Sequence, residues 1–229
     1  MQRAYLIPAY EAGRSLKQVI DGLRLHDGSA TVLVVDDGSS DDTAEVARAN
    51  GAELARHPRN RGKGVALRTG FSWLAERGFE AAVTVDADGQ HRAEDALLLA
   101  RHPAPPGTLL LGVRDLARDG APGPSQFSNG LSNFWVSLFS GVRLTDTQCG
   151  LRRYPLRATL ALGSDARGYA FECEMLVRAV RRGIPIVEVP VRVIYPAKAE
   201  RVSHFRVVRD PARIVLRLVH TALTVRRSA

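Results

Sequence analysis

The sequence of 229 residues predicts an α/β protein with a mostly parallel central sheet flanked by helices. Short apolar runs rich in β-branched residues alternate with amphipathic segments of helical spacing through the first half of the chain. Two parallel strands that are neighbours in a sheet need a crossover connection, usually a helix, and such crossovers are right-handed. This alternation therefore predicts a parallel sheet with right-handed helical crossovers. Polar clusters follow the strands directly, at the edge where open α/β sheets bind ligands.

The predicted strands are short and mostly apolar, as in sheets covered on both faces. The first is ended by Pro8, and the fourth stops at two aspartates, Asp86 and Asp88. The predicted strands span residues 3–7, 31–35, 53–55, 81–85, 108–111, 151–154 and 184–195.

Helices are predicted where apolar residues recur at helical spacing. In 13–25, for example, Leu16, Val19, Ile20 and Leu23 follow this spacing. The other predicted helices run from Thr43 to about 50, from Gly62 to about 77, and over 94–101, 129–139, 171–182 and 207–225. The Gly/Pro-rich segment 115–126 is predicted to be a long loop.

No internal repeat, low-complexity segment or linker is evident, which favours one domain over residues 1–206, with 207–229 as a basic helical appendage of the same domain. No apolar stretch is long enough to cross a bilayer, and strand-like sequence begins at Ala4, so no signal peptide is expected. Cys149 and Cys173 do not form a disulfide framework. These features predict a cytoplasmic protein.

The charge of the chain is uneven. Its net charge is +8, and residues 201–229 contribute seven arginines against one acid, Asp210. A basic tail of this kind suits a membrane surface or a nucleic acid. The main body has no basic patch interleaved with aromatic residues, which argues against nucleic acid.

Asp86 and Asp88 are the clearest candidates for a metal site. Side chains alternate along a strand, so both carboxylates are expected on one face at the strand's end. Their repulsion is relieved by a hard cation such as Mg²⁺ or Mn²⁺, which prefers oxygen ligands, and Gln90 adds a neutral oxygen. The alternative is a solvated Asp-x-Asp turn.

Four further polar positions follow other strands or loops. Asp37, next to Asp36, could accept hydrogen bonds from a base or ribose, or belong to the cap of the following helix. Lys63 stands at a helix start that favours an anion, although the P-loop spacing is missing. Arg114 suits a diphosphate, or forms an ion pair. Asp146 could be a general base or orient another group.

The later half of the chain offers weaker signals. His204 and Arg206 flank the last loop, where a lone histidine is more often structural than catalytic. Glu172 and Glu174 begin a helix, and one of them is expected to turn inward. The last helix carries a stripe of arginines and two apolar flanks, so it could pack on the body or lie in a membrane interface.

Taken together the motifs resemble those of family 2 glycosyltransferases of GT-A fold, and among them the polyprenol-phosphate type represented by dolichol-phosphate mannose synthase. The resemblance covers nearly the whole chain to about Arg213. The motifs are Ile7-Pro8-Ala9-Tyr10, Val34-Val35-Asp36-Asp37-Gly38-Ser39-Ser40-Asp41-Asp42-Thr43, Asn60-Arg61-Gly62-Lys63-Gly64, Asp86-Ala87-Asp88-Gly89-Gln90-His91, Gly112-Val113-Arg114, Asp146-Thr147-Gln148-Cys149-Gly150-Leu151-Arg152, Phe171-Glu172-Cys173-Glu174, Glu188-Val189-Pro190-Val191 and Ser203-His204.

The resemblance implies inverting transfer of a hexose from a nucleotide-diphospho-sugar, of the GDP-mannose or UDP-glucose type, to polyprenyl phosphate. It implies that Asp86, Asp88 and Gln90 hold Mg²⁺ or Mn²⁺, with Asp88 and Asp146 as the catalytic residues. The residues implied to bind the sugar nucleotide are Pro8, Tyr10, Glu11, Asp37, Lys63, Asp86, Ala87, Asp88, Arg114, His204 and Arg206.

Two departures from the family pattern bear on these expectations. The family usually has Asn-Glu after Pro-Ala-Tyr, whereas this chain has Glu11-Ala12, so Glu11 either replaces the ribose-binding acid or the contact is lost. The family also often has an arginine for the acceptor phosphate where this chain has 124–127 without a base. Three hypotheses follow: transfer to polyprenyl phosphate at the cytoplasmic membrane face, the same chemistry on a soluble acceptor, or non-catalytic binding of a nucleotide-sugar.

Overall fold

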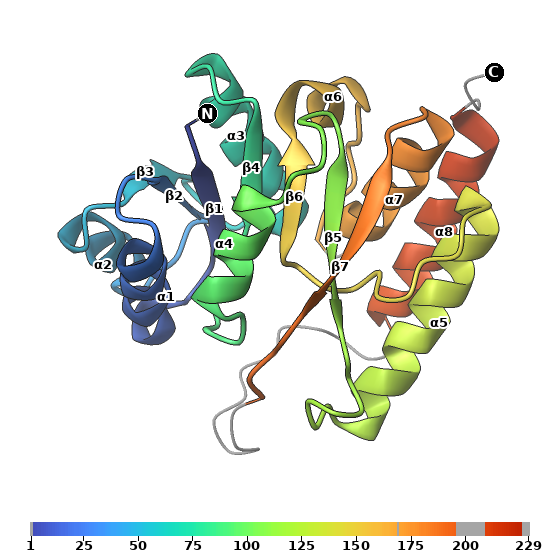
Figure 1. Ribbon diagram of the computed structural model, residues 1–229, viewed down its shortest axis with the longest axis horizontal. Coiled ribbons are helices and arrows are strands. Elements are labelled where there is room, and N and C mark those ends of the chain that lie inside the picture. The colour runs from blue at the N-terminus through green and yellow to red at the C-terminus, as the bar shows by residue number, and fades with distance from the viewer. Residues whose placement is uncertain (1, 169, 196–208, 226–229) are drawn as a thin grey trace.

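The computed structural model describes residues 2–168, 170–195 and 209–225. Within this part of the chain, seven strands form a single sheet in the order β3-β2-β1-β4-β6-β5-β7 (Figure 1). All neighbours are parallel except β6, which runs antiparallel to both β4 and β5. The strands are β1 Ala4–Ala9, β2 Thr31–Asp36, β3 Glu53–Arg56, β4 Ala81–Thr84, β5 Leu109–Arg114, β6 Arg152–Pro155 and β7 Ile186–Val191.

Helices cover both faces of the sheet (Figure 1). One apolar core joins the sheet to α1, α2 and α4, and the other joins its opposite face to α3, α5, α6, α7 and α8. The helices are α1 Gly13–His26, α2 Thr43–Ala49, α3 Lys63–Glu76, α4 Ala93–Arg101, α5 Gly123–Ser140, α6 Leu156–Ala161, α7 Ala170–Arg181 and α8 Arg209–Thr224. The predicted α/β architecture is therefore confirmed.

Two local predictions were wrong, and one short helix was missed. β1 does not end at Pro8 but continues to Ala9. Proline is tolerated there because β4 pairs with β1 only at Tyr5 and Leu6, so the missing N–H lies beyond that ladder. The helix predicted over 129–139 starts at Gly123, since proline is well suited to the first turn of a helix. The short helix α6 was not predicted.

The last helix packs on the body of the protein. Ile214 and Leu218 on α8 belong to one of the two apolar cores, and α8 lies against α5 and α7. The suggested boundary between 206 and 207 falls outside the described residues, so the division into a domain and an appendage stays a prediction. Among the described residues, no helix combines the length and apolar character needed to cross a bilayer.

Candidate active site

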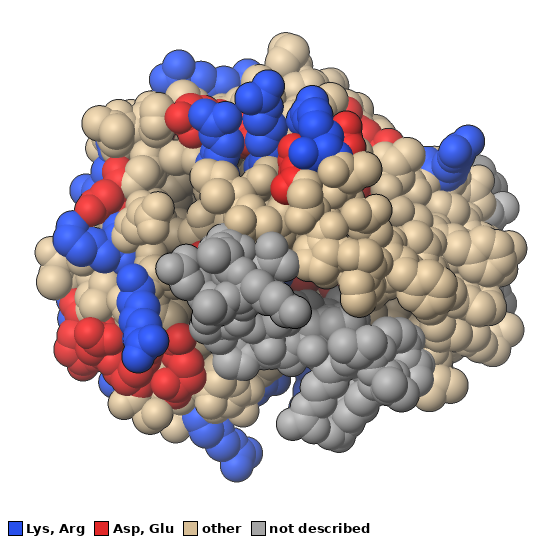
Figure 2. Space-filling view, turned by 90° about the horizontal axis from the view of Figure 1, so that it is seen from below, with Lys and Arg blue, Asp and Glu red and all other residues tan. Residues whose placement is uncertain are grey.

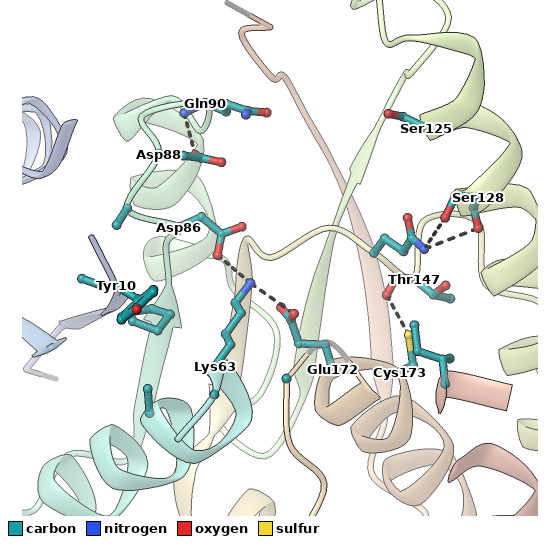
Figure 3. A pocket seen from close by; sticks show the side chains of 18 of the residues that line it. Tyr10, Lys63, Asp86, Asp88, Gln90, Ser125, Ser128, Thr147, Glu172 and Cys173 are labelled. Atoms are coloured by element: carbon teal, nitrogen blue, oxygen red, sulfur yellow. Dashed lines mark hydrogen bonds and ion pairs between the residues drawn. The ribbon is translucent and has the colours of Figure 1, made fainter. Parts of the chain in front are cut away.

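A cleft of about 690 Å³ opens at the carboxyl ends of the parallel strands. It gathers side chains from segments far apart in the sequence, as the fold predicts. Figure 3 shows Tyr10, Asp86 and Asp88 on one wall, Ser125 and Ser128 on the other, and Lys63 with Glu172 between them. The predicted site residues that line the cleft are Pro8, Tyr10, Asp37, Lys63, Asp86, Ala87, Asp88, Gln90 and Arg114.

Asp86 lies just past the end of β4, between the ammonium group of Lys63 and the imidazole of His91. Its Oδ1 is 2.7 Å from Nζ of Lys63, and its Oδ2 is 3.6 Å from Nε2 of His91. Burial alone would raise the pKa of Asp86, but Lys63 and His91 outweigh it and hold that pKa well below the usual range. Asp86 is therefore an ionised carboxylate.

Lys63 bridges two carboxylates across the floor of the cleft (Figure 3). Its Nζ lies 3.1 Å from Oε2 of Glu172 as well as 2.7 Å from Asp86. It sits at the first residue of α3, after Gly62, which has a positive φ of 93°. The helix start and the lysine together make this part of the cleft favourable to an anion such as a phosphate.

Asp88 stands closer to solvent, at the mouth of the cleft. Its Oδ1 accepts a hydrogen bond of 3.0 Å from the backbone N–H of Gln90. Partial burial and the nearby charge of Asp86 raise the pKa of Asp88. The charge of Asp86 thus opposes ionisation of Asp88, and a cation bound between the two carboxylates would relieve this repulsion.

The donor set fits a hard divalent cation. Asp86 and Asp88 offer only oxygen ligands, and the ammonium group of Lys63 already occupies a cation's position against Asp86. Within the described residues no cluster of three or more His, Cys, Asp or Glu side chains could hold a metal by itself. This matches Mg²⁺ sites, where one or two carboxylates act with water and substrate phosphates.

Gly150 leaves the space that Asp86 fills. A Cβ atom built on Gly150 would lie 2.3 Å from Oδ2 of Asp86, so any side chain here would displace the carboxylate. The loop that carries Gly150 is fixed by Arg152, a fully buried side chain. Its guanidinium donates to the backbone oxygens of Cys149, Thr147 and Glu172. Arg152 ends one of the family motifs, but its structural role could not be predicted from the sequence.

Asp37 is buried and anchors the loop before α3. Its carboxylate accepts hydrogen bonds from the backbone N–H groups of Arg61 and Gly62, and Oδ1 lies 2.6 Å from Nδ1 of His57. It therefore positions the segment that presents Lys63, while still contributing to the cleft wall. His57 was not singled out in the sequence, because nothing there links it to Asp37.

Glu11 lies outside the cleft lining. Its carboxylate accepts hydrogen bonds from the backbone N–H and the hydroxyl of Ser40, at 2.8 and 2.9 Å. Glu11 also has a positive φ of 51°, which is uncommon for a residue other than glycine. The structure thus ties Glu11 to the loop after β2 rather than to the cavity. His204 and Arg206 lie outside the described residues.

Arg114 and Asp146 form a bidentate ion pair at the edge of the cleft. Nε and Nη2 of Arg114 lie 2.7 and 2.9 Å from the two carboxylate oxygens, and the Arg114 backbone N–H adds a third bond. Asp146 is fully buried behind Arg114 and does not line the cavity. Burial would lower the pKa of Arg114, but Asp146 more than offsets it and the pKa is raised.

The wall opposite the aspartates was not predicted. It comprises neutral polar side chains from α5 and the loop before β6, together with Glu172 and Cys173 from α7. One of Glu172 and Glu174 was expected to turn inward, and both are buried. Glu172 faces Lys63, whereas Glu174 is 3.0 Å from Nε of Arg217 on α8. The polar residues of this wall are Ser125, Ser128, Thr147 and Gln148.

Comparison with known proteins agrees with this geometry. Residues 5–136 match the family described as Glycosyl transferase family 2. The undecaprenyl-phosphate mannosyltransferase of Micrococcus luteus is 32% identical over 202 residues, covering 82% of each chain. The UDP-N-acetylglucosamine–dolichyl-phosphate N-acetylglucosaminyltransferase of Methanococcus voltae is 30% identical over 224 residues, covering 83% of this chain and 84% of its own.

Solved structures match over almost the full length. Glucosyl-3-phosphoglycerate synthase from Mycobacterium tuberculosis, in complex with Mn²⁺, UDP-glucose and phosphoglyceric acid, aligns with a TM-score of 0.73. The match covers 96% of this chain and 79% of that one at 20% identity. At that identity the likeness concerns the fold, and it confirms the predicted GT-A architecture.

Proposed function

The chain belongs to glycosyl transferase family 2 and is a glycosyltransferase. We propose that it transfers a hexose from a nucleotide-diphospho-sugar to polyprenyl phosphate, with inversion at the anomeric carbon. We propose further that the reaction takes place at the cytoplasmic face of a membrane. The donor is of the GDP-mannose or UDP-glucose type. The observation that carries the proposal is the Asp86–Asp88 pair beside Lys63, in a cleft of about 690 Å³. That volume lies within the range of small-molecule sites.

The donor lies along the wall built by β1 and β4. Pro8 and Tyr10 flank the nucleoside, and Ala87 with Asp88 faces the sugar diphosphate. Lys63 and Arg114 supply positive charge to the phosphates, and Asp37 acts close to the base through the loop that it anchors. The closing of His204 and Arg206 over the phosphates stays a prediction from the sequence. Glu11 at the ribose also stays a prediction, although in the structure its carboxylate accepts hydrogen bonds from Ser40 outside the cleft lining.

Asp86 and Asp88, with Gln90 beside them, would hold Mg²⁺ or Mn²⁺ in this cleft. A bound cation supplies Lewis-acid stabilisation of the charge that develops on the leaving diphosphate. Lys63 adds to that stabilisation because its ammonium group already lies within 2.7 Å of Asp86. The same positive charges would lower the raised pKa of Asp88 and so favour its ionised form.

The acceptor enters from the wall formed by α5. An oxygen of its phosphate bonds to the anomeric carbon while the bond from that carbon to the diphosphate oxygen breaks. A phosphate acceptor is already anionic at neutral pH, so the reaction needs no strong base. Asp146 acts as a positioning residue that holds Arg114 at the cleft. The names of the Micrococcus and Methanococcus relatives support a lipid-phosphate acceptor.

A soluble acceptor is the second candidate. The segment 124–127 has no basic side chain where the family often places an arginine for the acceptor phosphate. Its cleft-lining residues are Pro124 and Ser125, which carry no charge. The third hypothesis, a non-catalytic binding protein, loses its basis because the chain belongs to a family of glycosyltransferases.

A thermal-shift screen of GDP- and UDP-sugars, with and without Mn²⁺, tests the donor assignment. We expect a stabilisation that needs both ligand and metal, because binding at hundredfold excess over Kd contributes about 3 kcal/mol. The Asp88→Asn variant should fold normally and lose the metal-dependent shift. A shift that is the same without Mn²⁺, or unchanged in the variant, would contradict the proposed site.

Transfer assays separate the two acceptors. Labelled sugar should pass from the donor that gives the shift into an organic-extractable product when polyprenyl phosphate is supplied. Transfer to phosphoglyceric acid, with none to polyprenyl phosphate, would select the soluble acceptor instead.

A further inference from the structure

His57 is a buried histidine behind the wall of the cleft. It follows β3 directly, is 6% exposed and does not line the cavity. Its backbone N–H donates to the backbone oxygen of Asp36 at 2.9 Å, which extends the pairing of β3 with β2. The backbone therefore holds this histidine at the carboxyl end of β2, beside Asp37.

The ring of His57 contacts two different elements. Its Nδ1 lies 2.6 Å from Oδ1 of Asp37, and its Nε2 lies 2.9 Å from Oγ1 of Thr69 on α3. A carboxylate only accepts hydrogen bonds, so Nδ1 carries a hydrogen and donates it to Asp37. The contact with Thr69 fixes the plane of the ring and, with it, the direction of that N–H group.

Asp37 passes this contact on to the turn before α3. Its two oxygens accept the backbone N–H of Arg61 at 3.0 and 3.1 Å, and Oδ2 accepts the N–H of Gly62 at 2.7 Å. Three donors thus fix a carboxylate that is 2% exposed. Without the ring of His57, Oδ1 would lose its shortest bond, and the orientation of the carboxylate would no longer be fixed.

The turn that Asp37 holds presents the positive end of α3 to the cleft. Gly62 is the N-cap residue, with a φ of 93°, and Lys63 is the first residue of the helix. Glycine has no side chain with which to bond the first N–H groups of the helix, which favours an anion at this end. A displaced Gly62 would therefore move both the helix start and the backbone of Lys63 relative to the cleft.

The contact between Asp37 and His57 is shielded from the charges at the surface. Figure 2 views the molecule from the side of the carboxyl ends of the parallel strands. It shows many charged side chains on its left-hand part, the side of α1 and α2 in Figure 1. Asp37 and His57 lie beneath the surface. Buried pairs are screened by salt much less than exposed ones, so this contact keeps its strength at high ionic strength.

We propose that His57 is a positioning residue for the donor diphosphate, because it orients Asp37 and, through Asp37, the turn formed by Gly62 and Lys63. The inference rests on the proposed function, since the diphosphate is the part of the donor that this turn would meet. It distinguishes two tasks that Asp37 could have. A carboxylate that reads the base affects nucleoside binding, whereas one that holds the turn affects phosphate binding.

Two substitutions separate the two contacts of the ring. His57→Asn places an amide N–H near the position of Nδ1 and still donates to Asp37, whereas His57→Gln places its amide near Nε2 and keeps only Thr69. Calorimetry with Mn²⁺ gives the Kd of UDP and GDP, and NMR titration follows uridine and guanosine. We expect His57→Gln to weaken the tighter diphosphate about tenfold or more, as for a lost hydrogen bond to a charged group. His57→Asn should stay close to wild type, and nucleoside binding should not change in either variant.

His102→Gln is the matched control. It makes the same chemical change in the loop before β5, where Nδ1 of His102 accepts the backbone N–H of Ala104 at 3.1 Å, outside the cleft lining. This variant should bind all four ligands as the wild type does. Equal losses in His57→Asn and His57→Gln would overturn the proposal. A loss as large for the nucleoside as for the diphosphate, or no loss at all, would overturn it too.

Amide hydrogen exchange in the free protein separates this inference from the proposed function. The N–H groups of Arg61 and Gly62 should exchange slowly in the wild type and in His57→Asn, and faster in His57→Gln, where their acceptor is released. If neither UDP nor GDP binds the wild type but exchange follows this pattern, the donor assignment fails and the role of His57 in holding the turn stands. Exchange that is equal in the three proteins overturns the proposal, whatever the nucleotides do.

Discussion

Asp146 illustrates how one residue can matter to a site that it does not line. Its carboxylate is fully buried and makes two side-chain bonds to Arg114, of which the longer is 2.9 Å. Breaking a buried pair by removing one partner leaves an uncompensated charge and costs about 3–5 kcal/mol. We therefore expect Asp146→Asn to lower the free energy of unfolding by an amount in that range, measured by urea denaturation.

A double-mutant cycle measures the interaction free energy of the Arg114–Asp146 pair separately from the effect of each single substitution. Removing Arg114 as well, in Arg114→Met/Asp146→Asn, should recover part of the loss, because no buried charge then remains unpaired. If the two single changes simply add, the ion pair does not account for the effect. The same cycle, followed by nucleotide binding, shows whether Asp146 acts on the donor only through Arg114.

Gly150 gives a prediction about geometry rather than charge. In Gly150→Ala the new methyl group meets Oδ2 of Asp86 at 2.3 Å and must push that carboxylate aside. We expect a stability loss of about 1–3 kcal/mol from the added bulk, together with loss of the Mn²⁺-dependent thermal shift. Gly107→Ala is the matched control, since a Cβ there meets nothing within 4 Å. A Gly150→Ala variant that binds Mn²⁺ and nucleotide normally would show that Asp86 is not needed where it stands.

At the scale of elements, Glu174 holds α8 on the body. From α7 it accepts hydrogen bonds from Ser164, Arg178 and Thr221, and it pairs with Arg217 of α8. Burial raises the pKa of Glu174, but these partners more than reverse the shift and leave the pKa lowered. The acid is therefore ionised and fully engaged at neutral pH.

The Glu174→Gln variant removes the charge that two arginines share. We expect the free energy of unfolding to fall by about 2–4 kcal/mol, as for other uncompensated buried charges. Hydrogen exchange in α8 should rise more than in β1, since the lost contacts join α7 to α8. Glu45→Gln serves as the control because Glu45 pairs with Arg48 only at an exposed site, 3.9 Å apart, where about 0.5 kcal/mol is expected. Equal effects of the two changes would contradict this account of α8 docking.

Over the whole molecule, the sheet and one wall of the cleft follow from local sequence patterns. Apolar β-branched runs place β1, β2 and β4, and parallel crossovers bring their carboxyl ends together. Asp86, Asp88 and Lys63 could be predicted because each lies directly at the end of a strand or the start of a helix.

The opposite wall could not be predicted from such patterns. Glu172 meets Lys63 across more than a hundred residues of sequence, and Arg152 acts through backbone oxygens that no side-chain motif reveals. His57 behind Asp37 is a pairing of the same long-range kind. The early start of α5 was missed because glycine and proline suggest a loop, although proline fits a first helical turn.

Acid sensitivity is a property of the molecule as a whole, because several carboxylates are held ionised by the fold. The hydrogen bonds from Arg3, at 2.5 and 2.6 Å, are the main cause that lowers the pKa of Asp27, and Tyr5 contributes another. The pKa values of Asp165 and Glu174 are lowered too, by contacts that include Arg217. Such groups bind protons more readily when unfolded, so their stabilisation is present above the unfolded pKa, about 4 for a carboxyl, and is lost as pH falls through the lower folded value.

We therefore expect the free energy of unfolding to decline steadily below about pH 4, with Asp27→Asn isolating one contribution. At pH 7 this variant should be less stable than the wild type by about 1.5–3 kcal/mol, the range for hydrogen bonds to a charged group. The difference should shrink as pH falls, because the wild-type carboxyl is then protonated and loses the same interaction. Urea denaturation at a series of pH values measures both curves. A difference that stays constant down to pH 2 would mean that Asp27 contributes through packing, and that the hydrogen bonds from Arg3 and Tyr5 to the ionised Asp27 carboxylate do not stabilise the start of β1.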